Sequence, residues 1–179
     1  FLFSGPLLAQ EEIESREVAS REAIKSLSES LKVHLKAGLE NEIDTKEKLL
    51  MCKEGAMEAT ALTNEKYPFE IGRTGLRVRN PSNQPDEWES SILLKFEERM
   101  NSGESIKAIE HSAILQINGK KHFRYMKAIP VGKVCLSCHG TTIEPKVLAM
   151  LNTIYPHDEA RGFKIGDIRG AFTVRVILK

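Results

Sequence analysis

The hydrophobic period of this chain changes from helical to strand-like at about Ala113. Earlier in the chain, apolar residues recur at spacings of three and four between charged ones: Ile24, Leu27, Leu31 and Leu35. This spacing predicts a long amphipathic helix over residues 11–40. After Ala113, two alternating runs flank Asn118-Gly119, a dipeptide that favours a hairpin with a type I′ turn. Helices followed by antiparallel strands indicate an α+β fold, in which helices flank a small sheet.

Further elements follow from the same kind of pattern. A second helix is predicted over residues 44–64, with one stripe formed by Leu49, Cys52, Ala56, Ala59 and Thr63. The Asn-Pro and Gln-Pro steps of residues 77–88 predict a loop. Asp86 is placed to cap a third helix that runs to about Met100. Residues 171–177 alternate apolar and polar side chains, which predicts a strand with one covered face.

The composition is that of one globular domain. The 179 residues can bury a sizeable core, and 26 Lys and Arg balance 25 Asp and Glu, so nucleic acid is not an expected partner. Residues 1–9 resemble the end of a signal-peptide apolar region, or of an anchor, which predicts export to the periplasm or another extracytoplasmic compartment. We therefore divide the chain into this remnant (1–9), an N-terminal amphipathic helix (10–40) and a folded domain (41–179).

A short motif, Cys135-Leu136-Ser137-Cys138-His139, holds two of the three cysteines. Two thiols one helical turn apart, beside an imidazole, suit the covalent attachment of haem through two thioethers. A redox dithiol is instead expected at a helix N-terminus in a βαβ unit, whereas this motif follows a hairpin strand. Structural zinc needs two further soft ligands, and the chain has no second Cys-x-x-Cys. The motif predicts one haem c bound at Cys135 and Cys138, with His139 as the proximal iron ligand.

The residues alone leave the second axial ligand of the iron open. Cys52 is favoured, because small Ala56 and Ala59 flank it and leave a shallow face for a flat porphyrin. Its alternative role is that of a small buried residue. Met51 and Met57 are assigned to packing, although methionine is a common ligand in cytochromes. The other candidates are the remaining methionines and four histidines: His34, His111, His122 and His157.

Two further groups of residues are candidates for the walls of the haem pocket. Arg73, Arg77 and Arg79 carry guanidinium groups suited to the haem propionates, and their alternative role is a solvated basic loop. Phe123 and Tyr125 precede the motif on a predicted strand, one face of which is expected to wall the haem; core packing would produce the same pattern.

Three segments, found in this order along the chain, carry a family resemblance: RTGLRVRNPSNQPDEWE (73–89), FRYMKAIPVGKVCLSCHG (123–140) and YPHDEARGFKIGDIRGAFTV (155–174). Over residues 40–178 the chain resembles the bacterial c-type haem domain with a PAS-like fold, found as exported single-domain proteins and as sensor input modules. The resemblance implies a PAS-like antiparallel sheet flanked by helices. It also implies that a cysteine of an upstream helix is the distal iron ligand, and the matching position is Cys52.

The expected ligands indicate a function. A thiolate donates more electron density to iron than a thioether or a second imidazole, so it favours the ferric state. We expect an exported monohaem cytochrome that acts as a redox or diatomic-gas sensor or as a low-potential electron carrier, and not as an enzyme. The expected partners are a redox or separate signalling protein, a diatomic ligand, and a second copy joined through the N-terminal helix. The alternatives are a peroxidase-like or nitric-oxide-converting enzyme, or a haem subunit of a respiratory or photosynthetic complex.

Overall fold

The structure is a computed structural model that describes residues 5–40 and 44–178. Its longer helices are α1 (Gly5–Glu40), α2 (Thr45–Lys66), α3 (Glu87–Asn101) and α5 (Pro145–Ile154), and its strands are β1 (Glu70–Thr74), β2 (Glu110–Ile117), β3 (Lys120–Pro130) and β4 (Ile168–Ile177). A short helix, α4 (Leu136–His139), lies between β3 and α5, and three single 3₁₀ turns complete the order. The α+β class and the long N-terminal helix are confirmed. No helix among the described residues is long and apolar enough to cross a bilayer.

The four strands form one antiparallel sheet in the order β1-β4-β3-β2. The predicted hairpin is confirmed as β2 and β3, since Asn118 and Gly119 join them with φ angles of 52° and 76°. Both angles are positive, as a type I′ turn requires. The C-terminal strand β4 lies between β1 and β3, so the last segment of the chain completes the centre of the sheet.

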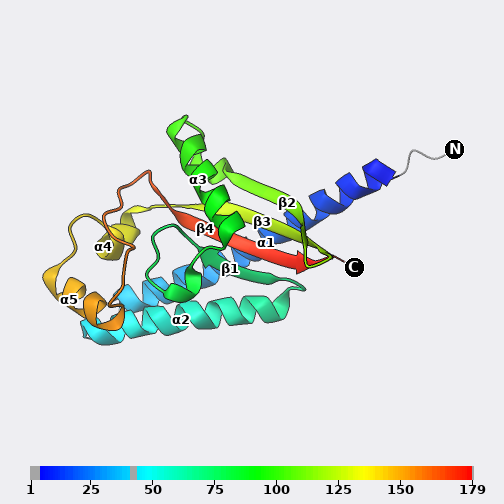
Figure 1. The fold of residues 1–179 in the computed structure, drawn as a ribbon. Helices are drawn as coiled ribbons and strands as arrows, with labels where there is room; N and C mark the ends of the chain where they lie inside the picture. Colours follow the sequence, from blue (N-terminus) through cyan, green and yellow to red (C-terminus); the bar gives the residue numbers. More distant parts are fainter. Residues whose placement is uncertain (1–4, 41–43, 179) are drawn as a thin grey trace.

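One face of the sheet packs against α1 and α2, which lie side by side along it (Figure 1). The core on this face is formed by Ala23, Ile24, Leu27, Ala59, Ile71, Phe123, Tyr125, Phe172 and Val174. Because α1 supplies three of these buried side chains, the N-terminal helix shares its core with the predicted domain that follows it. The helix already begins at Gly5, inside the predicted remnant, and residues 1–4 lie outside the described part of the chain.

The opposite face of the sheet is covered by α3 (Figure 1). Asp86 accepts a hydrogen bond from the Glu89 backbone N–H, and the Glu89 carboxylate accepts one from the Asp86 N–H, so the predicted cap is confirmed as a capping box. The prediction of one covered face for the C-terminal strand is wrong for its first half. Ala171 is buried against α3 while Phe172 is buried against α1 and α2, because helices lie on both sides there.

A carboxylate on the first residue of β2 ties α1 to the sheet. Glu110 accepts hydrogen bonds from Arg21 Nε of α1 at 2.9 Å, Tyr125 Oη at 2.7 Å and Lys127 Nζ at 2.8 Å. Partial burial by itself would raise the pKa of Glu110, but these hydrogen bonds outweigh it and lower that pKa to about 2. The Glu110 carboxylate is therefore charged in the folded protein at ordinary pH.

This network predicts a pH-dependent part of the stability. Because the pKa of Glu110 falls from 4.5 to about 2 on folding, its stabilisation is fully present above about pH 4.5 and is lost as the pH falls from 4.5 towards 2. Denaturant unfolding between pH 3 and pH 6 measures this slope. We expect Glu110→Gln to flatten it, whereas Glu70→Gln, at an exposed pair with Arg175, serves as the control. An unchanged slope in Glu110→Gln would contradict the assignment.

Candidate functional site

The Cys-x-x-Cys-His motif lies directly after β3, where a 3₁₀ turn (Lys133–Cys135) leads into the single turn of α4. Both thiols are partly buried, and Cys135 Sγ accepts a hydrogen bond from Gly132 N at 3.4 Å. Cys135 packs against the small apolar cluster of Val131, Ala160 and Phe163. All three cysteines of the chain are free. The helical turn therefore presents the two thiols and the imidazole on a short, locally supported segment.

The His139 ring is held in one orientation by the segment that precedes β4. Its Nδ1 lies 2.7 Å from the carbonyl oxygen of Ala160, which can only accept, so Nδ1 carries the proton and donates it. The edge of the ring contacts Phe163, with 6.4 Å between ring centroids. Burial, helped by the charges of Arg169 and Arg79, lowers the pKa of His139 to about 3. The imidazole is therefore neutral, and Nε2 keeps a free lone pair for a metal.

A buried carboxylate organises the backbone that holds His139. The Asp158 side chain has 0% exposure and accepts hydrogen bonds from Arg79 Nε at 3.1 Å, Arg161 Nε at 2.8 Å and Ala160 N at 2.9 Å. Burial by itself would raise the pKa of Asp158, but these bonds lower it. The same segment pairs with the motif backbone, because Phe163 N donates to the carbonyl oxygen of His139 at 2.9 Å. Asp158 thus fixes the peptide that orients the imidazole.

The third cysteine, Cys52, lies on α2. Burial raises the pKa of Cys52, and the neighbouring thiol of Cys138 raises it further, so the two sulfurs are within electrostatic reach of each other. Tyr155, at the end of α5, is also close, since its ring lies 5.6 Å from the Nζ of Lys53 and its pKa responds to Cys52. The fold therefore brings Cys52 to the motif from a position more than 80 residues earlier in the chain.

Four arginines surround the motif. Burial and the charges of Arg79 and Arg73 lower the pKa of Arg169 to about 10, and burial also lowers the pKa of Arg73. Arg79 donates a hydrogen bond to the carbonyl oxygen of Cys138. The guanidinium groups of Arg77 and Arg169 lie 3.7 Å and 5.2 Å from the ring centroid of Phe163. Positive charge crowded in this way is suited to an anionic group with more than one carboxylate.

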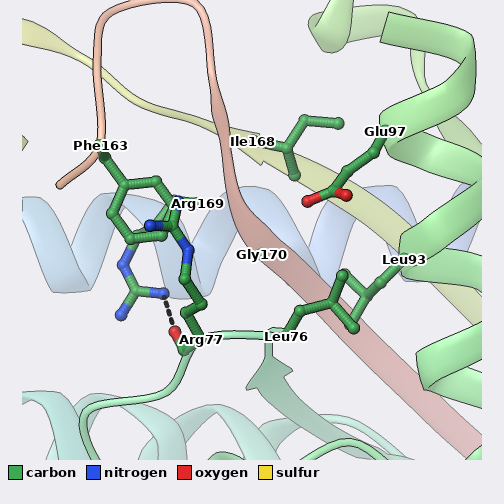
Figure 2. Close-up of a pocket in the computed structure, with 8 residues that line it drawn as sticks. All are labelled: Leu76, Arg77, Leu93, Glu97, Phe163, Ile168, Arg169 and Gly170. Atoms are coloured by element: carbon green, nitrogen blue, oxygen red, sulfur yellow. Dashed lines mark hydrogen bonds between the residues drawn. The ribbon is translucent and has the colours of Figure 1, made fainter. Parts of the chain in front are cut away.

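A small pocket adjoins the arginines on the side of α3 (Figure 2). Arg77 and Arg169 lie against Phe163 at one end, and Arg169 Nη1 donates to the carbonyl oxygen of Arg77 at 3.1 Å. Leu93 and Glu97 close the other end from α3. The pocket therefore extends from the arginines of the site toward the face of the sheet that α3 covers.

The structure brings together most of the residues that the sequence predicts. Cys52, Cys135, Cys138 and His139 gather with the predicted arginines Arg73, Arg77 and Arg79. The assignment of Phe123 and Tyr125 to the pocket is wrong. Both are buried in the core under α1, a different cluster from the one that contains Cys135, because their side chains point to the α1 face.

Several other predictions are corrected or extended. Met51 and Met57, predicted to pack, are exposed by 39% and 59%. His111 packs against Trp88 of α3, and His34 of α1 packs against Gly55. The residues that sequence reasoning missed are Tyr155, Asp158, Ala160, Phe163 and Arg169. All five fall in the segment YPHDEARGFKIGDIRGAFTV, and its family resemblance was the sequence signal that could have pointed to them. The resemblance does not give their contacts, because a backbone carbonyl acceptor or a ring contact leaves no pattern in the sequence.

Comparisons with known proteins agree with this architecture. The model of the Tll0287-like family matches residues 7–176. A solved structure, that of the cyanobacterial haem-protein Tll0287, superposes with a TM-score of 0.68 at 19% identity, covering 92% of this chain and 96% of that one. None of the curated proteins matches the chain. Since the family match spans nearly the whole sequence, the chain belongs to the Tll0287-like family.

Proposed function

We propose that this protein binds one haem covalently through Cys135 and Cys138, with His139 and Cys52 as the iron ligands. The observation that carries the proposal is the fixed imidazole: Nδ1 of His139 donates to Ala160, which leaves Nε2 free beside two thiols one helical turn apart. A solved relative in fold is described as a haem-protein, which supports the same cofactor here.

The donors present fit this group. A neutral imidazole and a cysteine sulfur are both established axial ligands of haem iron. Arg73, Arg79 and Arg169 supply more positive charge than Asp158 balances, as the two propionates require. Bound haem supplies an iron centre that changes oxidation state and can bind diatomic gases. Ala160 holds the imidazole through Nδ1, and the fold places the sulfur of Cys52 within electrostatic reach of the Cys138 thiol.

From these ligands we propose a redox or diatomic-gas sensor or a low-potential electron carrier, working with a separate redox or signalling protein. A thiolate ligand favours ferric iron, so the reduction potential is expected to be low. Cys52 lies on α2, and α2 packs against α1, so release of the sulfur from iron would act on both helices. That connection supports sensing, whereas retention of both ligands in each oxidation state would support electron transfer.

The test uses protein matured with a cytochrome c assembly system. We expect the intact mass to exceed that of the polypeptide by one haem, and Cys135→Ser with Cys138→Ser to remove covalent attachment. In visible and electron-paramagnetic-resonance spectra, Cys52→Ala is expected to abolish a low-spin thiolate signature that the exposed neighbour variant Met51→Ala retains. A colourless protein of bare polypeptide mass would overturn the proposal. An unchanged spectrum in Cys52→Ala would assign the distal position to another residue.

Carbon monoxide binding separates the two roles. If the reduced wild type binds carbon monoxide in place of the sulfur, the sensor role is supported. If neither oxidation state takes up an external ligand, electron transfer is supported. Turnover of peroxide or nitric oxide by the matured protein would instead support the enzyme alternative.

A further inference from the structure

The two N-terminal helices approach each other closely beside Cys52. A Cβ added to Gly38 of α1 would lie 2.7 Å from Cys52 Sγ and 3.4 Å from the carbonyl oxygen of Lys48 on α2. Real Cβ atoms essentially never come so close to a heavy atom, so any side chain at residue 38 requires the sulfur or the helices to move. The Cys52 sulfur therefore lies directly against the α1 backbone, at a residue without a side chain.

Helix α1 is anchored to the sheet earlier along its length. Ala23, Ile24 and Leu27 of the same helix are fully or almost fully buried in the core under the sheet. Arg21 binds Glu110 of β2, which ties the helix to the sheet a second time. A methyl group at residue 38 is therefore expected to displace the short cysteine side chain, which has a single side-chain torsion, more readily than the helix.

We infer that Gly38 is a positioning residue for the Cys52 sulfur, so that α1 sets where the distal ligand of the proposed haem lies. This inference rests on the proposed function. Its physical basis is that ligand groups of a metal are oriented by the atoms packed around them, and a small change in that packing alters the metal–ligand bond. Gly38 has no chemistry of its own and acts only through the space that it leaves for the sulfur.

The first test is the matured Gly38→Ala protein. We expect covalent haem to be retained, the ferric thiolate signature to weaken, and the reduction potential to rise because a strong electron donor is lost. Cys135 and Cys138 are consumed by thioethers in this protein, so iodoacetamide reports on Cys52 alone. The rate at which iodoacetamide labels Cys52 is expected to be several-fold higher in Gly38→Ala than in the wild type. Unchanged spectra, potential and labelling, or a stronger thiolate signature, would overturn the inference.

Two control variants isolate the sulfur contact. Val33→Ala changes an α1 residue that is 67% exposed, and it is expected to leave every readout unchanged. Gly55→Ala disturbs the same helix pair through a different neighbour, since its Cβ would lie 2.4 Å from His34 Nδ1. If Gly55→Ala weakens the thiolate signature as much as Gly38→Ala does, the effect belongs to helix packing in general and the inference is overturned.

A second test needs no haem and remains informative if Gly38→Ala folds poorly. In the polypeptide, the effect of Gly38→Ala on the free energy of unfolding is measured with Cys52 and again with Cys52→Ala. We expect destabilisation in the first background and recovery in the second, because alanine favours a helix interior more than glycine once the sulfur is gone. If Gly38→Ala changes the free energy of unfolding equally in both backgrounds, the proposed contact between residue 38 and the Cys52 sulfur is overturned.

The outcomes also separate this inference from the proposed function. If the matured wild type lacks haem, the proposed function and the ligand-positioning role of Gly38 are overturned together. If the wild type carries haem with the expected thiolate signature and Gly38→Ala leaves that signature unaffected, only this inference is overturned.

Discussion

Gly170→Ala is expected to lower the free energy of unfolding by roughly 3 kcal/mol, from strained backbone and overpacking together. Gly170 lies near the start of β4 with a φ of 153°, a conformation that other residues rarely adopt. A Cβ there would lie 2.2 Å from the carbonyl oxygen of Thr74 on β1, whose backbone cannot move without breaking the strand pair. Denaturant unfolding of the two proteins measures the difference.

The matched control is Gly72→Ala, in the neighbouring strand. Its Cβ would meet only the Cγ2 of Thr173, at an ordinary 3.8 Å, and its φ is not positive. We expect it to change stability by less than about 1 kcal/mol. Because Arg169 precedes Gly170 and its charge acts on His139, Gly170→Ala should also disturb the cationic side of the site. Equal stability of the two variants would show that the chain at Gly170 relaxes freely.

Arg124→Met is expected to destabilise the protein by about 3–5 kcal/mol, because it leaves a buried acid without its partner. Arg124 is 3% exposed in the sheet and donates to Asp86 at 2.8 Å and to Glu89 at 2.9 Å. Glu89 also accepts from Thr173 Oγ1 at 2.7 Å, and the guanidinium lies 4.7 Å from the ring centroid of Trp88. The methionine fills the apolar volume but cannot pair the carboxylates between α3 and the sheet.

Two comparisons separate charge pairing from packing. Arg175→Met breaks an exposed pair with Glu70 directly across the sheet, and such pairs contribute only about 0–1 kcal/mol. Adding Glu89→Gln to Arg124→Met removes the charge that was left buried, so part of the lost stability is expected to return. If the double variant is no more stable than Arg124→Met, packing of the arginine stem outweighs its charge.

Local elements were predictable where one short-range pattern dominates. The Asn118-Gly119 turn, the Asp86 cap and the apolar stripe of α1 each depend on neighbours within a few residues, and each is found as predicted. Strand β1 and helix α5 were not predicted, because β1 is a five-residue strand with a glycine in it and α5 is a single short helix. Their form depends on what they pack against.

The residues of the candidate site also divide into those that local sequence predicts and those that only the fold places. The spacing of Cys135, Cys138 and His139 is local chemistry and needs no fold to be recognised. The position of Phe123 and Tyr125 was misjudged, because alternation along a strand reveals two faces but does not say which of them meets the motif. Arg124 shows the same limit, since a charged residue in an alternating strand is expected in solvent and here is buried by α3.

By itself the amino-acid sequence determined the α+β class, the hairpin, the helix cap and the motif that carries the thiols and the imidazole, because each is encoded within a few neighbouring residues. Only the tertiary structure decided that Cys52 lies within electrostatic reach of Cys138, that Ala160 and Asp158 orient His139, and that Gly38 leaves room for a sulfur. Those contacts join residues far apart in the chain, and they form only when burial of the core brings α1, α2 and the segment before β4 together.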